Sequence, residues 1–337
     1  VARFAALLAG LPPSTPGATV NRLCASGLQA VVDAARAVSC GEGDLYIAGG
    51  VESMSRAPYV MAKSESAYSR DVKLYDSTIG ARFQNPRLVK QYGDHSMPQT
   101  GDNVARDFGI TRAEADQFAL SSQQRYVRAE TDGFYNGEIL PVSLPAKKKD
   151  APPTIVDADE HPRRDSSIDS LAKLKPLFEG GVVTAGNASG VNDGAAALVI
   201  ASRGWGERHG KQPLARILSA ASAGVEPRIM GVGPAYAIPK ALERAKLALE
   251  DMDLIEINEA FASQVLGCLK LMKLDFNDAR VNPNGGAIAI GHPLGASGAR
   301  LALTAARELQ RRGQRYAAVS LCIGVGQGLA VILERSR

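Results

Sequence analysis

The sequence predicts a mixed α/β fold with at least two domains. Helical patterns alternate with short apolar strand patterns along the chain, which is the order expected of sheets covered by helices. The chain has 337 residues, more than one ordinary hydrophobic core holds. Glycine contributes 34 residues and aromatic side chains only 5%. We therefore expect many tight turns and cores packed mainly from Ala, Val, Leu and Ile.

The first half of the chain predicts helices around one strand. Apolar positions 4, 7, 8 and 11 predict a helix at the start, and apolar positions from 28 to 38 predict a second helix after Cys24. Residues 44–50 predict a short buried strand. From residue 51 to 186 the pattern changes, and we interpret this stretch as an insertion over a core domain. Its expected elements are helices at 103–108, 112–128 and 170–178 and a proline-rich loop at 141–165.

The second half predicts regular alternation of strands and helices. Strands are expected at 194–200, 215–223, 254–257, 316–321 and 329–333. Helices are expected at 235–249, from 259 onward and at 296–312.

A weak internal repeat links two of the predicted helices. Ala25-Ser26-Gly27 recurs as Ala296-Ser297-Gly298, and Ala34-Ala35-Arg36 recurs at the same offset as Ala305-Ala306-Arg307. Chance matches in alanine-rich helices and internal duplication both account for this. Duplication predicts that Cys24 and His292 enter matching helices from matching ends, so that two similar domains face one site.

Composition excludes several classes of protein. The net charge of +4 is mild and its basic residues are dispersed, so we expect no nucleic-acid partner. The four cysteines show no CxxC spacing, which predicts neither a metal site nor a disulfide framework, and Cys40 and Cys268 are expected in the core. No apolar run is long enough to span a membrane and no signal peptide is recognisable, so a cytoplasmic protein is expected.

Cys24 and His292 suit nucleophilic thiol chemistry. Cys24 opens a predicted helix, whose unpaired N–H groups and positive dipole end lower a thiol pKa from its usual ~8.5. His292 follows the glycine-rich run 285–291 and precedes Pro293, which fixes its backbone on a turn where it could accept a proton. Taken alone, Cys24 would be interpreted as a buried core cysteine.

Cys322 and Asn258 are the other candidate catalytic residues. Cys322 follows a strand and precedes Gly324, where a backbone N–H can face a developing oxyanion while the Cys322 thiolate acts as a base. The alternative is a cysteine that ends a strand before a turn. Asn258 stands where a strand leads into a helix. It is either a helix N-cap or an amide that orients a water or a carbonyl.

These motifs together resemble the thiolases, the acetyl-CoA C-acyltransferases, in the family's order from about residue 10 to the C-terminus. The runs that carry the resemblance are Cys24-Ala25-Ser26-Gly27, the segment 49–55, Asn187-Ala188-Ser189-Gly190, Asn258-Glu259-Ala260-Phe261, the segment 285–293 and Cys322-Ile323-Gly324.

The resemblance implies two similar αβ domains in a five-layered αβαβα arrangement plus a loop domain. It implies an N-terminal domain at 1–54 and 187–206, a loop domain at 55–186 and a C-terminal domain at 207–337. It also implies coenzyme A and acyl-CoA as substrates, no permanently bound cofactor, and a homotetramer or homodimer.

The resemblance further assigns roles to individual residues. Cys24 is acylated and His292 activates it, while Asn258 holds a water that forms one oxyanion hole with His292. The N–H groups of Cys24 and Gly324 form the other hole, and Cys322 moves the α-proton of acetyl-CoA. The positions that match the CoA-binding surface are Arg163, Ser170, Phe178, Ala185, Ser189 and Phe261.

Three further features refine the resemblance. Ser96-Met97-Pro98 replaces the His-Met-Gly of biosynthetic acetoacetyl-CoA thiolases. This run, with Glu160-His161-Pro162-Arg163 and Asn282-Pro283-Asn284-Gly285, is more similar to degradative thiolases, the β-ketoadipyl-CoA thiolases in particular. Only 23 residues precede Cys24, whereas the family has a further β–α–β stretch there, which needs ~30 residues. We therefore expect an N-terminally truncated chain with an incomplete first domain.

The expected activity is thiolytic cleavage of a 3-oxoacyl-CoA, or the reverse Claisen condensation, with 3-oxoadipyl-CoA as the substrate. Acetoacetyl-CoA thiolases and fatty-acid β-oxidation thiolases are alternatives. A relative of the ketoacyl or hydroxymethylglutaryl-CoA synthases is disfavoured by Cys322. A non-catalytic CoA or lipid carrier is disfavoured because every reactive position is filled.

Overall fold

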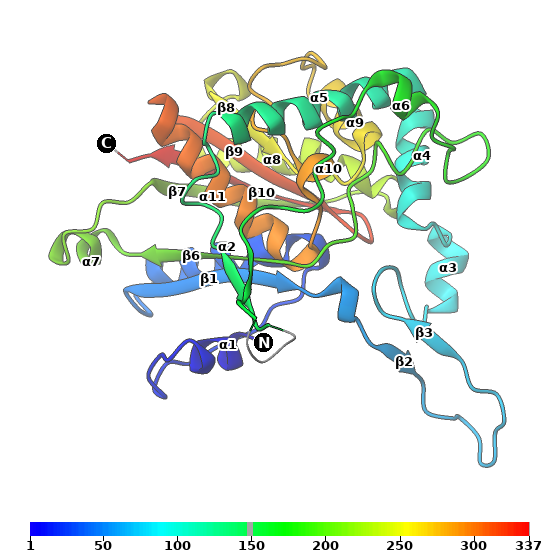
Figure 1. The fold of residues 1–337 in the computed structure, drawn as a ribbon, viewed down its shortest axis with the longest axis horizontal. Helices are drawn as coiled ribbons and strands as arrows, with labels where there is room; N and C mark the ends of the chain where they lie inside the picture. The colour runs from blue at the N-terminus through cyan, green and yellow to red at the C-terminus, as the bar shows by residue number, and fades with distance from the viewer. Residues whose placement is uncertain (147–150, 337) are drawn as a thin grey trace.

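Two helices, α2 (Ser26–Ser39) and α11 (Leu294–Arg312), lie side by side at the centre of the molecule (Figure 1). The computed structural model describes residues 1–146 and 151–336. A Cβ atom on Gly27 would lie 2.6 Å from the carbonyl oxygen of Gly295, and one on Gly298 would lie 2.5 Å from the backbone nitrogen of Leu28. Only glycine allows this approach, and both glycines come from the internal repeat. The repeat therefore places two matching helices against each other, as predicted.

A four-stranded sheet covers one side of this helix pair. Its strand order is β7 (Ala215–Gly224), β10 (Gln327–Arg335), β9 (Tyr316–Ile323) and β8 (Leu254–Ile257). Only β8 and β9 run parallel, while the other two pairs are antiparallel. The strand predicted at 254–257 has these bounds in the structure.

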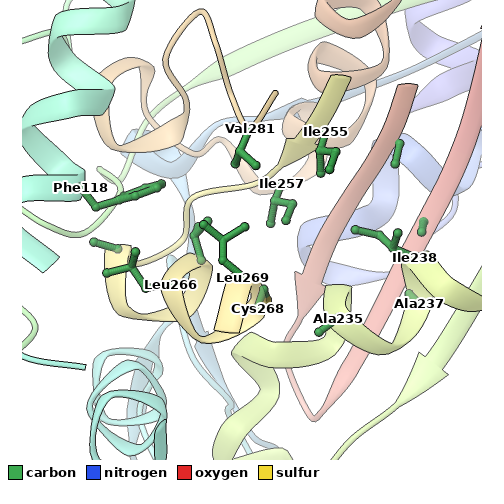
Figure 2. Packing of buried hydrophobic residues seen from close by; sticks show 14 of the residues in the cluster. Phe118, Ala235, Ala237, Ile238, Ile255, Ile257, Leu266, Cys268, Leu269 and Val281 are labelled. Carbon is green, nitrogen blue, oxygen red and sulfur yellow. The ribbon is translucent and has the colours of Figure 1, made fainter. Parts of the chain in front are cut away.

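The outer face of the four-stranded sheet is covered by α8 (Gly233–Ala245) and α9 (Ala262–Leu271). Figure 2 shows Ile238 of α8, Ile255 and Ile257 of β8, and Leu266 and Cys268 of α9 in one buried apolar cluster. Cys268 is thus a core residue, as expected. Burial of such side chains stabilises the fold by roughly 1.5–3 kcal/mol each, and this core fixes the end of β8 at the candidate site.

A second sheet lies on the other side of α2 and α11. It consists of β1 (Leu45–Glu52) paired antiparallel with β6 (Gly194–Ala201). The described residues thus form four packed layers, with α2 and α11 between the two sheets. The prediction that β1 is buried is wrong. Its residues Ile47 and Val51 are exposed, because the helices cover only one face of this sheet.

The segment between β1 and β6 forms the predicted insertion. Helices α4 (Met97–Phe108) and α5 (Arg112–Thr131) pack against α9. The helix expected at 170–178 is only α6 (Ile168–Ala172), because a residue that precedes proline, here Lys175, avoids the helical region. The other elements are hairpin β2 (Tyr59–Met61) and β3 (Leu74–Asp76), hairpin β4 (Val142–Leu144) and β5 (Thr154–Val156), and α3 (Pro86–Tyr92).

Three short helices lie outside these layers or between them. They are α1 (Ala2–Leu8), α7 (Arg203–Arg208) and α10 (Ala287–Ile290). Of these, α10 positions the candidate site, because it ends two residues before His292. No helix in the described ranges is long and apolar enough to cross a membrane. Cys40, expected in the core, is exposed at the end of α2 instead, because that helix end projects beyond both sheets.

Candidate active site

Cys24 lies in a one-turn 3₁₀ helix, Leu23–Ala25, that leads directly into α2. Leu23 has a φ angle of 51°, a left-handed conformation that is strained for leucine and turns the chain sharply. The Ser26 hydroxyl secures this turn, since it accepts the Arg22 N–H at 2.9 Å and donates to the Leu23 carbonyl at 2.7 Å. The turn places the Cys24 thiol at the N-terminal end of α2.

The pKa of Cys24 contradicts one sequence-based expectation. Burial raises it to about 11, while the N–H of Gly324 and the backbone of Cys24 itself lower it and the charge of Glu52 raises it. Desolvation therefore outweighs the helix N-terminus, and the prediction of a lowered pKa is wrong for the ligand-free protein. Cys24 is a neutral thiol at pH 7, and its attack on an acyl group requires a base.

His292 is the candidate base. The residue is buried between α10 and α11, and its backbone N–H donates to the Gly190 carbonyl at 3.3 Å. Its Nδ1 lies 2.6 Å from Oγ of Ser297. The Ser297 hydroxyl donates its proton to the Pro293 carbonyl at 3.0 Å, so Oγ accepts from Nδ1–H. This assignment leaves the lone pair on Nε2, where a proton can be received.

His292 is neutral in the resting protein. Burial lowers its pKa to about 4, and the positive charge of Arg300 lowers it further. Neutral His292 and neutral Cys24 together exclude a preformed thiolate–imidazolium pair at pH 7. The thiol proton of Cys24 is therefore expected to move as the acyl carbon is attacked, so that no ion pair has to form before the attack.

Asn258 faces His292 from the end of β8. The N-cap interpretation of Asn258 is wrong, because α9 begins at Ala262 and its N-cap residue is Phe261. The side-chain nitrogen of Asn258 lies 3.3 Å from Nε2 of His292. Its oxygen Oδ1 is buried without a hydrogen-bond partner among the described residues. Such an oxygen needs a donor, and a water or a protonated group of a substrate fits that need.

Cys322 and Gly324 approach Cys24 from the four-stranded sheet. Cys322 is buried in β9 and packs with Met230 and Phe261. Burial and the neighbouring Cys24 thiol hold the pKa of Cys322 well above its usual value. Gly324 follows in the turn between β9 and β10, where its N–H points at the Cys24 thiol. The thiols of Cys24 and Cys322 are thus neighbours.

The predicted CoA-binding residues divide into two groups. Ser189 and Phe261 lie at the site, since the Ser189 N–H donates to the Ala260 carbonyl at 3.0 Å and Ala188 pairs with Phe261 in a β-bridge. The other four lie along an exposed segment and do not join the catalytic cluster: Arg163, Ser170, Phe178 and Ala185. Arg163 is steadied there by its guanidinium, which donates to the His161 carbonyl at 2.8 Å.

Three residues of the site were not predicted from the sequence. Ser297 fixes His292, and its place in the internal repeat was a usable signal. Glu52 accepts the N–H of Gly295 at 2.9 Å, which ties β1 to the start of α11. Glu259 accepts the Ser122 hydroxyl at 2.6 Å and the Ile288 N–H at 3.1 Å, which ties α5 to α10. No local pattern indicates the partners of either glutamate.

Comparison with known proteins identifies this arrangement. Residues 1–204 match the N-terminal domain of thiolase, and residues 211–335 match the thiolase C-terminal domain. The chain belongs to the thiolase family. This confirms the family and the acyltransferase class that the motifs predicted.

The relatives include named bacterial enzymes. The β-ketoadipyl-CoA thiolase of Pseudomonas aeruginosa is 58% identical over 99% of this chain and 83% of its own length. The 3-oxoadipyl-CoA/3-oxo-5,6-dehydrosuberyl-CoA thiolase of Escherichia coli is 57% identical over the same shares. Human mitochondrial 3-ketoacyl-CoA thiolase, solved in complex with CoA, superposes with a TM-score of 0.89 at 43% identity, covering 99% of this chain and 81% of that one. The superposition confirms the predicted thiolase fold.

Proposed function

We propose that this thiolase cleaves 3-oxoadipyl-CoA with CoA to give acetyl-CoA and succinyl-CoA, and catalyses the reverse condensation. Two observed juxtapositions support the reaction: Asn258 lies beside Nε2 of His292, and Cys322 and the Gly324 N–H lie beside Cys24. The substrate rests on the similarity to relatives named for 3-oxoadipyl-CoA.

In the first half-reaction, Cys24 attacks the C3 carbonyl of the substrate while Nε2 of His292 takes the thiol proton. The N–H groups of Cys24 and Gly324 stabilise the oxyanion at C3. The C2–C3 bond then breaks, which leaves a succinyl group on the Cys24 sulfur and an acetyl-CoA carbanion. His292 and a water held by Asn258 stabilise its enolate oxygen, and the Cys322 thiol donates the proton to C2.

In the second half-reaction, the Cys322 thiolate takes the proton of an incoming CoA thiol. The CoA sulfur attacks the succinyl carbonyl and displaces Cys24, which recovers its proton from His292. Both cysteines and the histidine return to their starting state, so the cycle balances. The neutral resting forms of Cys24 and His292 support this sequence, because His292 becomes charged only when Cys24 is acylated and is neutral again once Cys24 is released.

We further propose that CoA lies along the exposed segment that holds Arg163, Ser170, Phe178 and Ala185, with its thiol end near Ser189 and Phe261. The expected division into an N-terminal domain (1–54 and 187–206), a loop domain (55–186) and a C-terminal domain (207–337) belongs to the same proposal. A homodimer or homotetramer is expected too, and exposed apolar side chains on the β2–β3 hairpin, Tyr59, Met61 and Leu74, support association.

A substrate panel tests the proposed activity. The purified protein is mixed with CoA and, in separate reactions, 3-oxoadipyl-CoA, acetoacetyl-CoA and a medium-chain 3-oxoacyl-CoA. Loss of the 3-oxoacyl-CoA absorbance gives kcat/KM for each. We expect the highest value for 3-oxoadipyl-CoA. A higher value for acetoacetyl-CoA or the medium-chain substrate would overturn the substrate assignment, and no turnover of any substrate would overturn the activity.

A further inference from the structure

A hollow lined by four arginines lies outside the candidate active site. It has a volume of about 350 Å³ and is formed by α5, the segment 277–284 and the C-terminal end of α11. Arg125 and Arg128 enter it from α5, and Arg311 and Arg312 from α11. We call it the arginine hollow. None of these arginines has a role in the catalytic steps above.

The two arginines of α5 are held in place by backbone carbonyls. Nη1 of Arg125 donates to the Val281 carbonyl at 2.7 Å, and Nη2 of Arg128 donates to the Pro283 carbonyl at 2.8 Å. Each bond uses one edge of a guanidinium group and leaves further N–H groups of the same fork available. An arginine already fixed by the protein loses less side-chain entropy when it binds a ligand.

The charges on the lining of the arginine hollow do not balance. Arg311 and Arg312 share one buried carboxylate, Glu308, and Arg311 makes both of its bonds to it at 2.7 Å. Asp132 is the carboxylate among the residues that line the hollow. The other carboxylates near the arginines stand behind this lining: Glu308 at Arg311 and Arg312, and Glu256, Glu259 and Asp278 near Arg125. The lining itself therefore presents four guanidinium groups and one carboxylate to solvent. A confined excess of this kind attracts anions.

Asn284 gives an independent sign of a missing partner. Its residue lines the arginine hollow and is only 3% exposed. Its side-chain nitrogen is buried, and Glu308 is its neighbour, yet no described residue accepts a hydrogen bond from it at normal geometry. A buried donor without an acceptor costs roughly 1–3 kcal/mol. An anion or a water in the hollow would meet that need.

We propose that the arginine hollow binds a small phosphate-bearing anion. Guanidinium forks approach from two helices in different directions, and a tetrahedral phosphate offers acceptor oxygens in more than one plane, whereas a carboxylate offers two in one plane. The Pro283–Asn284 backbone at the hollow continues into Gly285 and Gly286, and from there through α10 to His292. An anion bound here would steady the segment that carries the catalytic histidine.

Titration calorimetry at low ionic strength tests this proposal with inorganic phosphate and, separately, with ADP. The two probes distinguish a free phosphate from a phosphate ester. Arg128→Gln combined with Arg312→Gln removes two guanidinium groups. It keeps Arg125, which binds the Val281 carbonyl, and Arg311, which binds Glu308. Arg203→Gln, at an exposed position that starts α7, is the control for loss of an arginine away from the hollow. Circular dichroism checks that each variant is folded.

We expect saturable binding of at least one probe to the wild-type protein and to the Arg203→Gln control. The double variant should bind that probe at least tenfold more weakly, because two charge-assisted contacts to the anion are lost. Two results would overturn the proposal. One is heat no greater than that of chloride at the same ionic strength. The other is equal affinity in the double variant, which would place the anion elsewhere.

Discussion

The side-chain nitrogen of Asn258 lies 3.3 Å from Nε2 of His292, while the oxygen of the same amide is buried without a partner among the described residues. One amide group therefore meets the proposed base through its nitrogen and keeps its oxygen free to accept a hydrogen bond. This arrangement requires the end of β8 and the turn before α11 to meet, and neither is near the other in sequence. Asn258 is the residue through which the two parts of the site can be tested together.

Replacing Asn258 tests its proposed part in the oxyanion hole. Asn258→Ala should lower kcat/KM by about 10²–10³, the usual cost of one oxyanion-hole donor. The fold should persist, because Asn258 caps no helix. Steady-state kinetics with circular dichroism measure both effects, and Asn136→Ala at an exposed position is the control. Near-normal kcat/KM in Asn258→Ala would show that this amide does not serve the transition state.

Ser297 should control which nitrogen of His292 carries the proton. Without its Oγ, the Nδ1–H loses its acceptor and the imidazole is free to turn. We expect Ser297→Ala to slow acylation of Cys24 roughly tenfold or more, but by less than the 10²–10⁴ lost with the base itself. Rapid-quench measurement of CoA release from acetyl-CoA gives this rate.

Ser39→Ala is a matched control for Ser297→Ala, since the Ser39 hydroxyl also donates to a carbonyl four residues earlier, that of Ala35, at 2.8 Å. It should leave the acylation rate unchanged. An equal loss in both variants, or no loss in Ser297→Ala, would contradict the assigned hydrogen-bond pattern.

Glu52 should influence the reactivity of the nucleophile. Burial is the main cause that raises the pKa of Cys24 to about 11, and the Glu52 charge adds to it. Glu52→Gln removes the charge and keeps an oxygen that can accept the Gly295 N–H. The pKa should fall, so more thiolate should form at any given pH and alkylation by iodoacetamide should reach half its limiting rate at a lower pH.

The alkylation rate must be read from the mass of the peptide that holds Cys24, because Cys40 is exposed and reacts as well. Glu42→Gln, in the exposed turn after α2, is the control and should not move the midpoint. A midpoint that rises or stays in place in Glu52→Gln would refute the electrostatic role.

Cys322 should separate the two kinds of chemistry at the site. Cys322→Ala should still become acylated at Cys24, since that step uses only the nucleophile, His292 and the N–H groups. It should no longer exchange the α-protons of acetyl-CoA with deuterated solvent, and turnover should fall by about 10²–10⁴. Mass spectrometry follows both reactions. Normal exchange in this variant would assign the α-proton to another base.

The sequence predicted those parts of the fold that depend on local pattern. The strand at 254–257 has the predicted bounds, because its four residues are all buried between packed layers. The repeat around Gly27 and Gly298 indicated that α2 and α11 are matching helices. The two helices pack closely because both contact positions are glycine. Cys24, His292 and Asn258 stood out because their glycine-rich or strand-end settings are visible in the chain.

What the sequence did not predict depends on distant neighbours. The raised pKa of Cys24 follows from its burial in the folded protein, whereas the local pattern showed only a helix start. Cys40 was expected in the core because a free cysteine is usually a small buried apolar residue, but it is exposed just after the end of α2. Gly295, the partner of Glu52, lies 243 positions away along the chain, and Ser122, a partner of Glu259, lies 137 positions away. No local sequence pattern predicts contacts over such distances.

The most direct test of the proposed mechanism is incubation of the protein with acetyl-CoA alone, followed by peptide mass spectrometry. The mechanism predicts release of CoA and an acetyl group on the peptide that contains Cys24, with neither product in Cys24→Ala. Acetylation confined to the peptides of Cys40, Cys268 or Cys322, or CoA release that persists in Cys24→Ala, would contradict the claim that Cys24 carries the acyl group.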